Sequence, residues 1–330
     1  MKINRKELLG SLLSVSSGVT KKEITGQSNS FVFGNREVRT YSNDIVGSCS
    51  VPLGIEGVVV GHPLLETLKK LPDEDLDLSV DNDKLVVKGK RRRVTFLLDK
   101  EVIMPRINTL GDYFEIDPEF FKAAEIVCDC ASNDTSKLVL CCVHWYSDYL
   151  EAMDGFQYIR YWLSKDNEKD VLIRHQGLRG IIDRPLNLCR IADNWIHFCN
   201  NDGLTLSCRS FLESYIDTDQ IVERTGSPME LPDLTGVVER AKIFSSERKL
   251  SNRIIVELKS GAIRLSGRGM TGQYQEVLDV EYDGPRLKFK ISPKMLLQIT
   301  KYSGECLVSD NKLMIVSDKF IYAVSLGQIK

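Results

Sequence analysis

The stretch SPKMLLQI at residues 292–299 carries the pattern that decides the fold, because the chain contains that pattern three times. In each copy the spacing of the apolar residues predicts a short amphipathic helix, which is followed by a strand, a polar turn and a second strand. The helices are GHPLLETL at 61–68, QGLRGII at 176–182 and SPKMLLQI at 292–299, and their turns and strands lie at 81–87, 201–206 and 310–315. The copies are roughly 110 residues apart. This period is too long for a solenoid or propeller repeat and fits one compact domain per copy.

Each third of the chain also opens with a predicted helix. These helices are expected at 5–15, from Asp117 to about Val127, and at 231–244. Asp117 can cap its helix, and Pro118 suits the first helical position. Strands between the helices alternate apolar and polar residues, as antiparallel sheets covered on one side do. The clearest of these strands are at 75–80, 280–282 and 287–291.

We therefore predict an α+β protein of three like domains, at 1–106, 107–225 and 226–330. Each domain is expected to combine antiparallel sheets with a pair of helices. The linkers at 105–112 and 223–228 are neither long nor of low complexity, so we expect the domains to be held close together.

Composition narrows the functional classes. Among the 330 residues, 44 are basic and 46 are acidic, so contacts with nucleic acid must come from local patches. Nine cysteines without regular spacing predict a reducing compartment and no disulfide framework, and no metal or cofactor site is predicted. The apolar run near the N-terminus is interrupted by Glu7 and serines, and no run of about 18 apolar residues follows it. A cytoplasmic protein without a membrane partner is expected.

The sequence offers little to a catalytic interpretation. His144 lies near Cys142 and His197 lies near Cys199, but a Cys–His nucleophile pair requires spatial contact that spacing does not establish. The chain has no phosphate loop and no G-x-S-x-G motif. We predict that the protein is not an enzyme, and alanine variants of Cys142 and His144 would test the catalytic alternative.

Basic residues recur on the six predicted helices. For any one of them, a position on an ordinary solvated face is the simpler interpretation. As a set they could line a common surface for duplex DNA, although acidic residues such as Glu66, Asp129 and Glu239 interrupt it. The candidate DNA-facing residues are Arg5, Lys6, Lys69, Lys70, Lys122, Arg179, Arg184, Arg240, Lys294 and Lys301.

Several segments, in order along the chain, resemble the bacterial DNA polymerase III beta subunit (sliding clamp) family. VERAKIF at 238–244 and QEVLDVEYDG at 275–284 are similar to its third domain. LEAMDGFQY at 150–158 resembles the family's TVATDGHRL segment, and SYID at 214–217 lies where the family has GRFPD. The first third matches less closely, at 63–72 and 88–90. The resemblance therefore covers the whole chain.

Departures from the family pattern are concentrated in one region. Met153 stands for a threonine, Phe156 and Gln157 for His-Arg, and Ile216 for a proline, while VSLGQIK replaces the family's C-terminal VMPMRL. They indicate a divergent clamp and suggest a phage or other mobile element as its source.

The resemblance implies a head-to-tail dimer that closes a ring of six domains, with helices lining the hole. Such a ring encircles double-stranded DNA and tethers a DNA polymerase, and a clamp loader opens it. The alternative is a clamp-like binding platform that does not encircle DNA. For the homodimer contact the resemblance implies Val94 and Phe96 on one edge strand, and Ile243 and Phe244 on the third opening helix. The alternative for these four is an ordinary core position.

The resemblance also implies a pocket between the second and third domains that takes a short peptide of each partner. Gly155 would allow a close backbone approach there. Core positions for Tyr158 and Ile221 are the alternative. The matching residues are Leu138, Met153, Gly155, Phe156, Tyr158, Ile216, Ile221, Val324 and Leu326.

Overall fold

The computed structural model describes residues 1–166, 169–245 and 253–329. The chain divides into two compact units. Unit 1 contains Met1–Cys128 and Lys169–Glu213, and unit 2 contains Asp129–Glu168 and Ser214–Lys330. This division passes through the middle of the second predicted domain, so the scheme of three separate domains stays a prediction.

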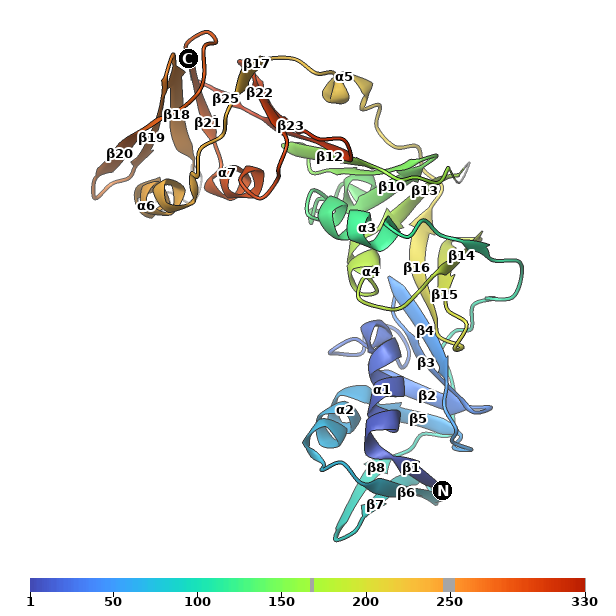
Figure 1. Ribbon diagram of the computed structural model, residues 1–330. Helices are drawn as coiled ribbons and strands as arrows, with labels where there is room; N and C mark the ends of the chain where they lie inside the picture. Colours follow the sequence, from blue (N-terminus) through green and yellow to red (C-terminus); the bar gives the residue numbers. More distant parts are fainter. Residues whose placement is uncertain (167–168, 246–252, 330) are drawn as a thin grey trace. The chain divides into compact units, whose positions relative to one another are not determined.

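Unit 1 contains two antiparallel sheets (Figure 1). The smaller has the order β1-β6-β7-β8, and the larger contains the run β13-β16-β4-β3-β2-β5, with β15, β14 and β9 following beside β16. The strands are β1 (Lys2–Asn4), β2 (Ser30–Gly34), β3 (Glu37–Tyr41), β4 (Ile45–Ser50), β5 (Gly57–Val60), β6 (Asp75–Asp81), β7 (Lys84–Gly89), β8 (Arg92–Leu97), β9 (Phe114–Glu115), β13 (Asp170–Arg174), β14 (Leu188–Ala192), β15 (Trp195–Cys199) and β16 (Thr205–Phe211).

The helices of unit 1 pack in pairs. α1 (Arg5–Val15) packs on α2 (Gly61–Lys70), and α3 (Phe120–Cys128) packs on α4 (His175–Arg179) (Figure 1). Asn4 caps the N-terminus of α1, because its side chain accepts a hydrogen bond from the amide of Lys6, and the helix buries Leu8, Leu12 and Val15. The first opening helix therefore has the predicted bounds and the predicted apolar face.

Unit 2 is built in the same way from two antiparallel sheets. One has the order β20-β19-β18-β21-β25, and the other contains the run β17-β22-β23-β24-β12-β11-β10. The strands are β10 (Cys142–Tyr146), β11 (Tyr149–Met153), β12 (Gln157–Trp162), β17 (Ser227–Met229), β18 (Ile254–Lys259), β19 (Ala262–Arg268), β20 (Gln273–Asp279), β21 (Leu287–Ile291), β22 (Glu305–Val308), β23 (Lys312–Val316), β24 (Phe320–Ser325) and β25 (Gly327–Gln328).

A third helix pair lies in unit 2, where α6 (Thr235–Ser245) packs on α7 (Pro293–Ile299) (Figure 1). The short helix α5 (Asp219–Val222) lies between β16 and β17 in sequence. Single 3-10 turns occur at Ser16–Gly18 and Leu138–Cys141. The antiparallel sheets and paired helices confirm the predicted α+β class.

Two strand pairings join thirds of the chain that the sequence divides. β4 of the first third pairs with β16 of the second, from Thr205↔Ser48 to Cys208↔Ile45. β12 of the second third pairs with β24 of the third, from Gln157↔Val324 to Tyr161↔Phe320. Hydrogen-bonded sheets therefore run across both predicted domain borders.

The structure corrects two expected elements. The helix predicted at 176–182 is shorter and ends at Arg179, with Gly177 inside it and Gly180 as its C-cap residue. A Cβ on Gly177 would lie 2.7 Å from the carbonyl oxygen of Asp44, and one on Gly180 would lie 2.4 Å from the Ile45 side chain. The glycines thus allow α4 to approach the start of β4, although glycine is a poor helix former. The strand predicted at 280–282 is absent, because only Tyr282 forms an isolated bridge, to Met229.

Candidate functional site

A hollow of about 530 Å³ opens in unit 2 beside β11, β12, β24 and α5. Three segments that are far apart in sequence supply its walls. The lining residues are Met153, Gly155, Phe156, Gln157, Tyr158, Gln220, Ile221, Glu223, Thr225, Asn311, Lys312, Ala323, Val324 and Ser325. The pairing of β12 with β24 brings two of these segments together, since Tyr158 lies directly opposite Ala323.

The structure brings six of the nine predicted pocket residues into this hollow: Met153, Gly155, Phe156, Tyr158, Ile221 and Val324. The other three do not line it. Leu138 begins the 3-10 turn before β10, Ile216 is 47% exposed in the segment before α5, and Leu326 is buried. The polar lining residues were missed, although Asn311 and Lys312 belong to the turn that marks the third repeat.

The floor of the hollow is apolar and packed. Tyr158 is 2% exposed and belongs to a buried cluster with Met314 and Ala323. Met153 and Ile221 pack against that cluster while lining the hollow. Tyr158 and Ile221 therefore contact both the core and the hollow, so the two interpretations given by the sequence are compatible.

A tight turn forms the rim. One carboxylate oxygen of Asp154 accepts hydrogen bonds from the amides of Phe156 at 2.8 Å and Gln157 at 2.9 Å. Gly155 has a φ of 91°, and a Cβ there would have nothing within 4 Å, so its backbone conformation alone favours glycine. Phe156 is 57% exposed at this rim.

Behind the floor, the carboxylate of Glu151 is 1% exposed and lies in a polar network. Its Oε1 is 2.7 Å from Nδ1 of His144. Its Oε2 accepts hydrogen bonds from the Tyr158 hydroxyl at 2.5 Å, from Nε of Arg160 at 3.1 Å and from the Thr218 hydroxyl at 2.9 Å. Burial raises the pKa of the Glu151 carboxyl, but hydrogen bonds from His144 and Tyr158 and the charge of Arg160 lower it by more, so its pKa lies below the ordinary value.

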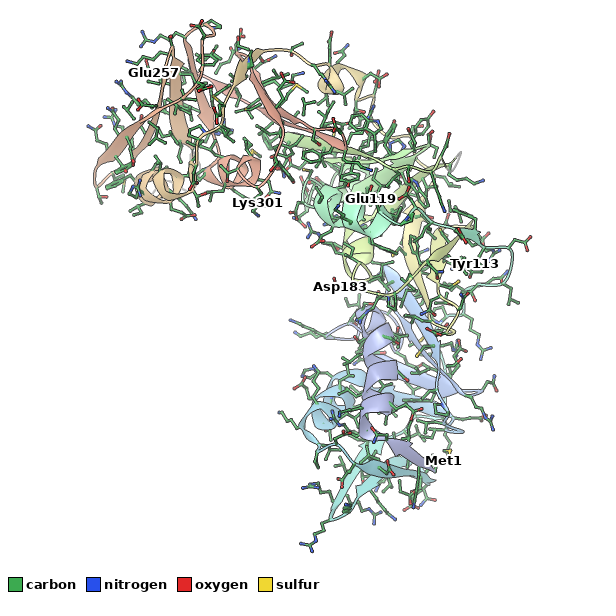
Figure 2. All side chains as sticks on the ribbon, in the orientation of Figure 1. Met1, Tyr113, Glu119, Asp183, Glu257 and Lys301 are labelled. Atoms are coloured by element: carbon green, nitrogen blue, oxygen red, sulfur yellow. The ribbon has the colours of Figure 1, made fainter. Side chains whose placement is uncertain are left out.

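The candidate DNA-facing residues differ in their surroundings. Lys6, Lys69 and Lys122 are exposed but form ion pairs, with Asp73 at 2.5 Å, Glu66 at 3.0 Å and Glu119 at 3.6 Å. Arg179 is exposed at the end of α4, and Arg5 is half-buried. Lys70, Lys294 and Lys301 are exposed and form no ion pair with the residues that the structure describes. Lys294 lies in α7, which carries no acidic residue, and Lys301 lies just beyond the end of that helix (Figure 2).

Two of these arginines already form hydrogen bonds with other residues of the protein. Arg184 lies beyond α4 instead of on it, is half-buried, and donates to the carbonyl oxygen of Leu13 at 3.0 Å. Arg240 donates to the carboxylate of Glu276 at 2.8 Å and to the hydroxyl of Tyr274 at 2.6 Å. Arg184 therefore joins the segment after α4 to α1, and Glu276 neutralises Arg240.

Two of the four residues expected at a dimer contact lie on the edge strand of a sheet, and the other two lie on α6, which packs beside a second edge strand. Val94 and Phe96 are half-exposed on β8, the edge strand of its sheet, where neighbouring Leu97 is 79% exposed. Ile243 is 64% exposed on α6, and Phe244 stacks on Tyr274 of β20, an edge strand of unit 2. None of the four is fully buried, so a core position does not account for them.

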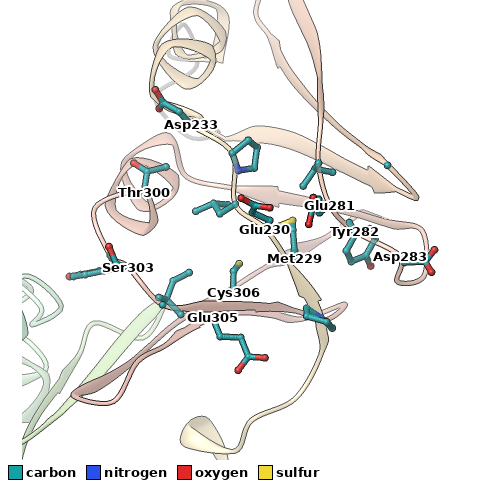
Figure 3. Close-up of a pocket in the computed structure, with 18 of the residues that line it drawn as sticks. Met229, Glu230, Asp233, Glu281, Tyr282, Asp283, Thr300, Ser303, Glu305 and Cys306 are labelled. Atoms are coloured by element: carbon teal, nitrogen blue, oxygen red, sulfur yellow. The ribbon is translucent and has the colours of Figure 1, made fainter.

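A larger hollow of about 1100 Å³ in unit 2 has an acidic lining (Figure 3). Its walls include five carboxylates and no lysine, arginine or histidine. The five are Glu230, Asp233, Glu281, Asp283 and Glu305. Phosphate groups would be repelled there, so the size of this hollow does not make it a nucleic-acid site.

Eight of the nine cysteines and three of the four histidines are buried, whereas Cys199 is half-buried and His62 is exposed. Burial raises the pKa of the Cys199 thiol and raises that of Cys306 to about 12, so both are protonated at neutral pH. Burial lowers the pKa of His197 to about 4, and its Nδ1 is 2.7 Å from the Ser207 hydroxyl. Within the described ranges, no group of three or more acidic, histidine or cysteine residues could hold a metal ion, and no helix is long and apolar enough to cross a membrane.

No protein-family model and no curated protein matches the sequence. Solved structures match it closely in fold. The DNA polymerase III beta subunit from Thermotoga maritima superposes with a TM-score of 0.88 at 18% identity, covering 100% of this chain and 99% of that one. The DNA polymerase III beta chain from Streptococcus pneumoniae gives 0.88 at 17%, covering 99% of each chain. A DNA polymerase sliding clamp from Pseudomonas aeruginosa gives 0.85 at 16%, covering 100% of this chain and 99% of that one. The chain therefore has the fold of the bacterial DNA polymerase III beta subunits, the sliding clamps.

Proposed function

We propose that this protein is a DNA sliding clamp, a processivity factor that is not an enzyme. Two copies would close head-to-tail into a ring of six domains, each with a helix pair facing the hole. The ring would encircle duplex DNA and tether a DNA polymerase, and a clamp loader would open it. The observation that carries the proposal is that the sliding-clamp fold extends over the whole length of both chains.

The paired helices support a weak, sequence-independent contact with DNA. Contacts between lysines and phosphates are sensitive to salt and carry no base information, which suits a protein that slides. Lys70, Lys294 and Lys301 are the best candidates, because they are exposed and form no ion pair with the described residues. Lys6, Lys69 and Lys122 are weaker candidates, because ion pairs partly neutralise their charges.

Retention on DNA tests encirclement. After loading, a ring should remain on closed circular DNA and slide off the ends of the same DNA once it is cut. Equal retention on circular and linear DNA would favour the alternative, a binding platform that does not encircle DNA. The mass of the native particle provides an independent check, because six domains require two copies of this chain.

The exposed edges support a homodimer. A head-to-tail contact between β8 of one copy and β20 of the next would cover Leu97 together with the apolar side chains of Ile243 and Phe244. The double variant Ile243→Lys, Phe244→Lys should give a folded monomer by light scattering. A variant that remains dimeric would remove these residues from the interface.

The 530 Å³ hollow is the proposed attachment point for partners. An apolar floor with both polar and apolar residues around it is typical of a site that binds the apolar side chains of a short peptide. A buried aliphatic anchor contributes about 2 kcal/mol. We expect Met153→Asp to abolish binding of the C-terminal peptide of the replicative polymerase encoded in the same genome. Leu326 does not line the hollow, so its aspartate variant would disturb the core instead. Unchanged peptide affinity in Met153→Asp would place the partner site elsewhere.

A further inference from the structure

One wall of the hollow is formed by α5, a helix that is too short to be stable by itself. α5 contains four residues, and none of them is buried. An isolated helix of this length is unstable in water, because helix nucleation is unfavourable. Gln220 and Ile221 of α5 nevertheless line the hollow. Contacts outside the helix must therefore hold this wall in place.

The N-terminal end of α5 is attached to the floor through Thr218. Thr218 is 3% exposed, and its carbonyl oxygen accepts a hydrogen bond from the amide of Ile221 at 2.9 Å. Its hydroxyl donates to Oε2 of Glu151 at 2.9 Å and accepts from a terminal nitrogen of Arg160 at 2.8 Å. The same carboxylate oxygen accepts the hydroxyl of Tyr158, which forms the floor. One buried carboxylate therefore links the floor to the wall.

The C-terminal end of α5 is attached through Lys312 of β23. Its Nζ donates to the carbonyl oxygens of Ile221 at 3.3 Å and Glu223 at 2.8 Å. Carbonyls at the end of a helix lack partners within the helix, and a lysine side chain can satisfy them. Lys312 is half-buried and forms no ion pair with a carboxylate of the described residues. Its ammonium group is therefore directed at the backbone of the wall.

We propose that Thr218 and Lys312 are positioning residues, which fasten the two ends of α5 and hold the hollow in the shape that its partner requires. The inference rests on the proposed function, since it concerns the same hollow. A partner that meets a loose wall has to order it on binding, and its apparent affinity falls by the fraction of molecules in which the wall is in place.

The test compares Thr218→Val, which removes the hydroxyl, with Thr218→Ser, which keeps it. Lys312→Met removes the donors at similar length, and Lys259→Met on the exposed end of β18 is the matched control. The probe is the C-terminal peptide of the replicative polymerase, titrated by calorimetry. Hydrogen exchange of the amides at 219–223 reports on the wall without any partner.

We expect Thr218→Val and Lys312→Met each to speed exchange at 219–223 and to weaken peptide binding about 3- to 10-fold, the equivalent of one hydrogen bond. Thr218→Ser and Lys259→Met should resemble the wild type in both measurements. Faster exchange with unchanged affinity would overturn the positioning role, and unchanged exchange would overturn the fastening itself. Failure of the wild type to bind the peptide would instead refute the proposed partner hollow, and the exchange data would then decide the fastening alone.

Discussion

Replacing Glu151 with glutamine would remove the charge at the centre of the network behind the hollow. The carboxylate is 1% exposed and accepts three hydrogen bonds on Oε2, one of them from the guanidinium of Arg160. Removing one partner of a buried ion pair leaves the other charge without compensation, which costs about 3–5 kcal/mol. We therefore expect Glu151→Gln to lower the free energy of unfolding by about that amount, and Arg160→Met to have a similar effect.

The effect should depend on pH in a defined direction. The pKa of Glu151 is lowered in the folded protein from an ordinary value of 4.5, by hydrogen bonds from His144 and Tyr158 and by the charge of Arg160, all acting against burial. A carboxyl group with a depressed folded pKa stabilises the protein fully above its unfolded pKa, and this stabilisation disappears as the pH falls through the folded value. The difference between wild type and Glu151→Gln should therefore be constant at neutral pH and shrink below about pH 4.5.

Urea unfolding followed by circular dichroism measures this difference, and a double-mutant cycle with Arg160→Met separates the coupling between the two charges. Glu276→Gln is the matched control, because it breaks the pair with Arg240 at a solvent-exposed site, where ion pairs contribute little. A loss for Glu151→Gln no larger than that of the control, or a loss independent of pH down to pH 3, would refute the reasoning.

Two further predictions concern packing and DNA. Gly177→Ala should destabilise unit 1, because its Cβ would lie 2.7 Å from a backbone oxygen. Gly10→Ala, whose Cβ would have nothing within 4 Å, should stabilise α1 by about 0.5–1 kcal/mol. Urea unfolding measures the free energy of unfolding of both variants, and equal effects would contradict the packing argument. Alanine at both Lys294 and Lys301 should reduce the slope of log affinity for linear duplex against log salt by roughly 2, measured by fluorescence anisotropy, while Lys259→Ala leaves it unchanged. An unaltered slope in the double variant would remove α7 from the DNA-facing surface.

The sequence determined the elements whose signals are local. The apolar spacing between Arg5 and Val15 and the polar residue before it set the bounds of α1, because capping and burial of one helix face act within a few residues. Alternation at 75–80 likewise predicted β6, in which Leu76 and Leu78 are buried. Six pocket residues came from the family resemblance, which carried the order of segments along the whole chain.

Tertiary structure decided what depends on contacts between distant segments. The alternation at 280–282 did not become a strand, because a strand needs a continuous partner and the only bridge of this stretch among the described residues joins Tyr282 to Met229. The glycines that shorten α4 are explained only by the approach of Asp44 and Ile45. His144, Tyr158 and Arg160 lie within nine residues of Glu151, but Thr218, which joins this network to α5, is 67 residues away along the chain. The link from Glu151 to α5 was therefore set by the packed structure, because a buried carboxylate can be stabilised by partners from any part of the chain.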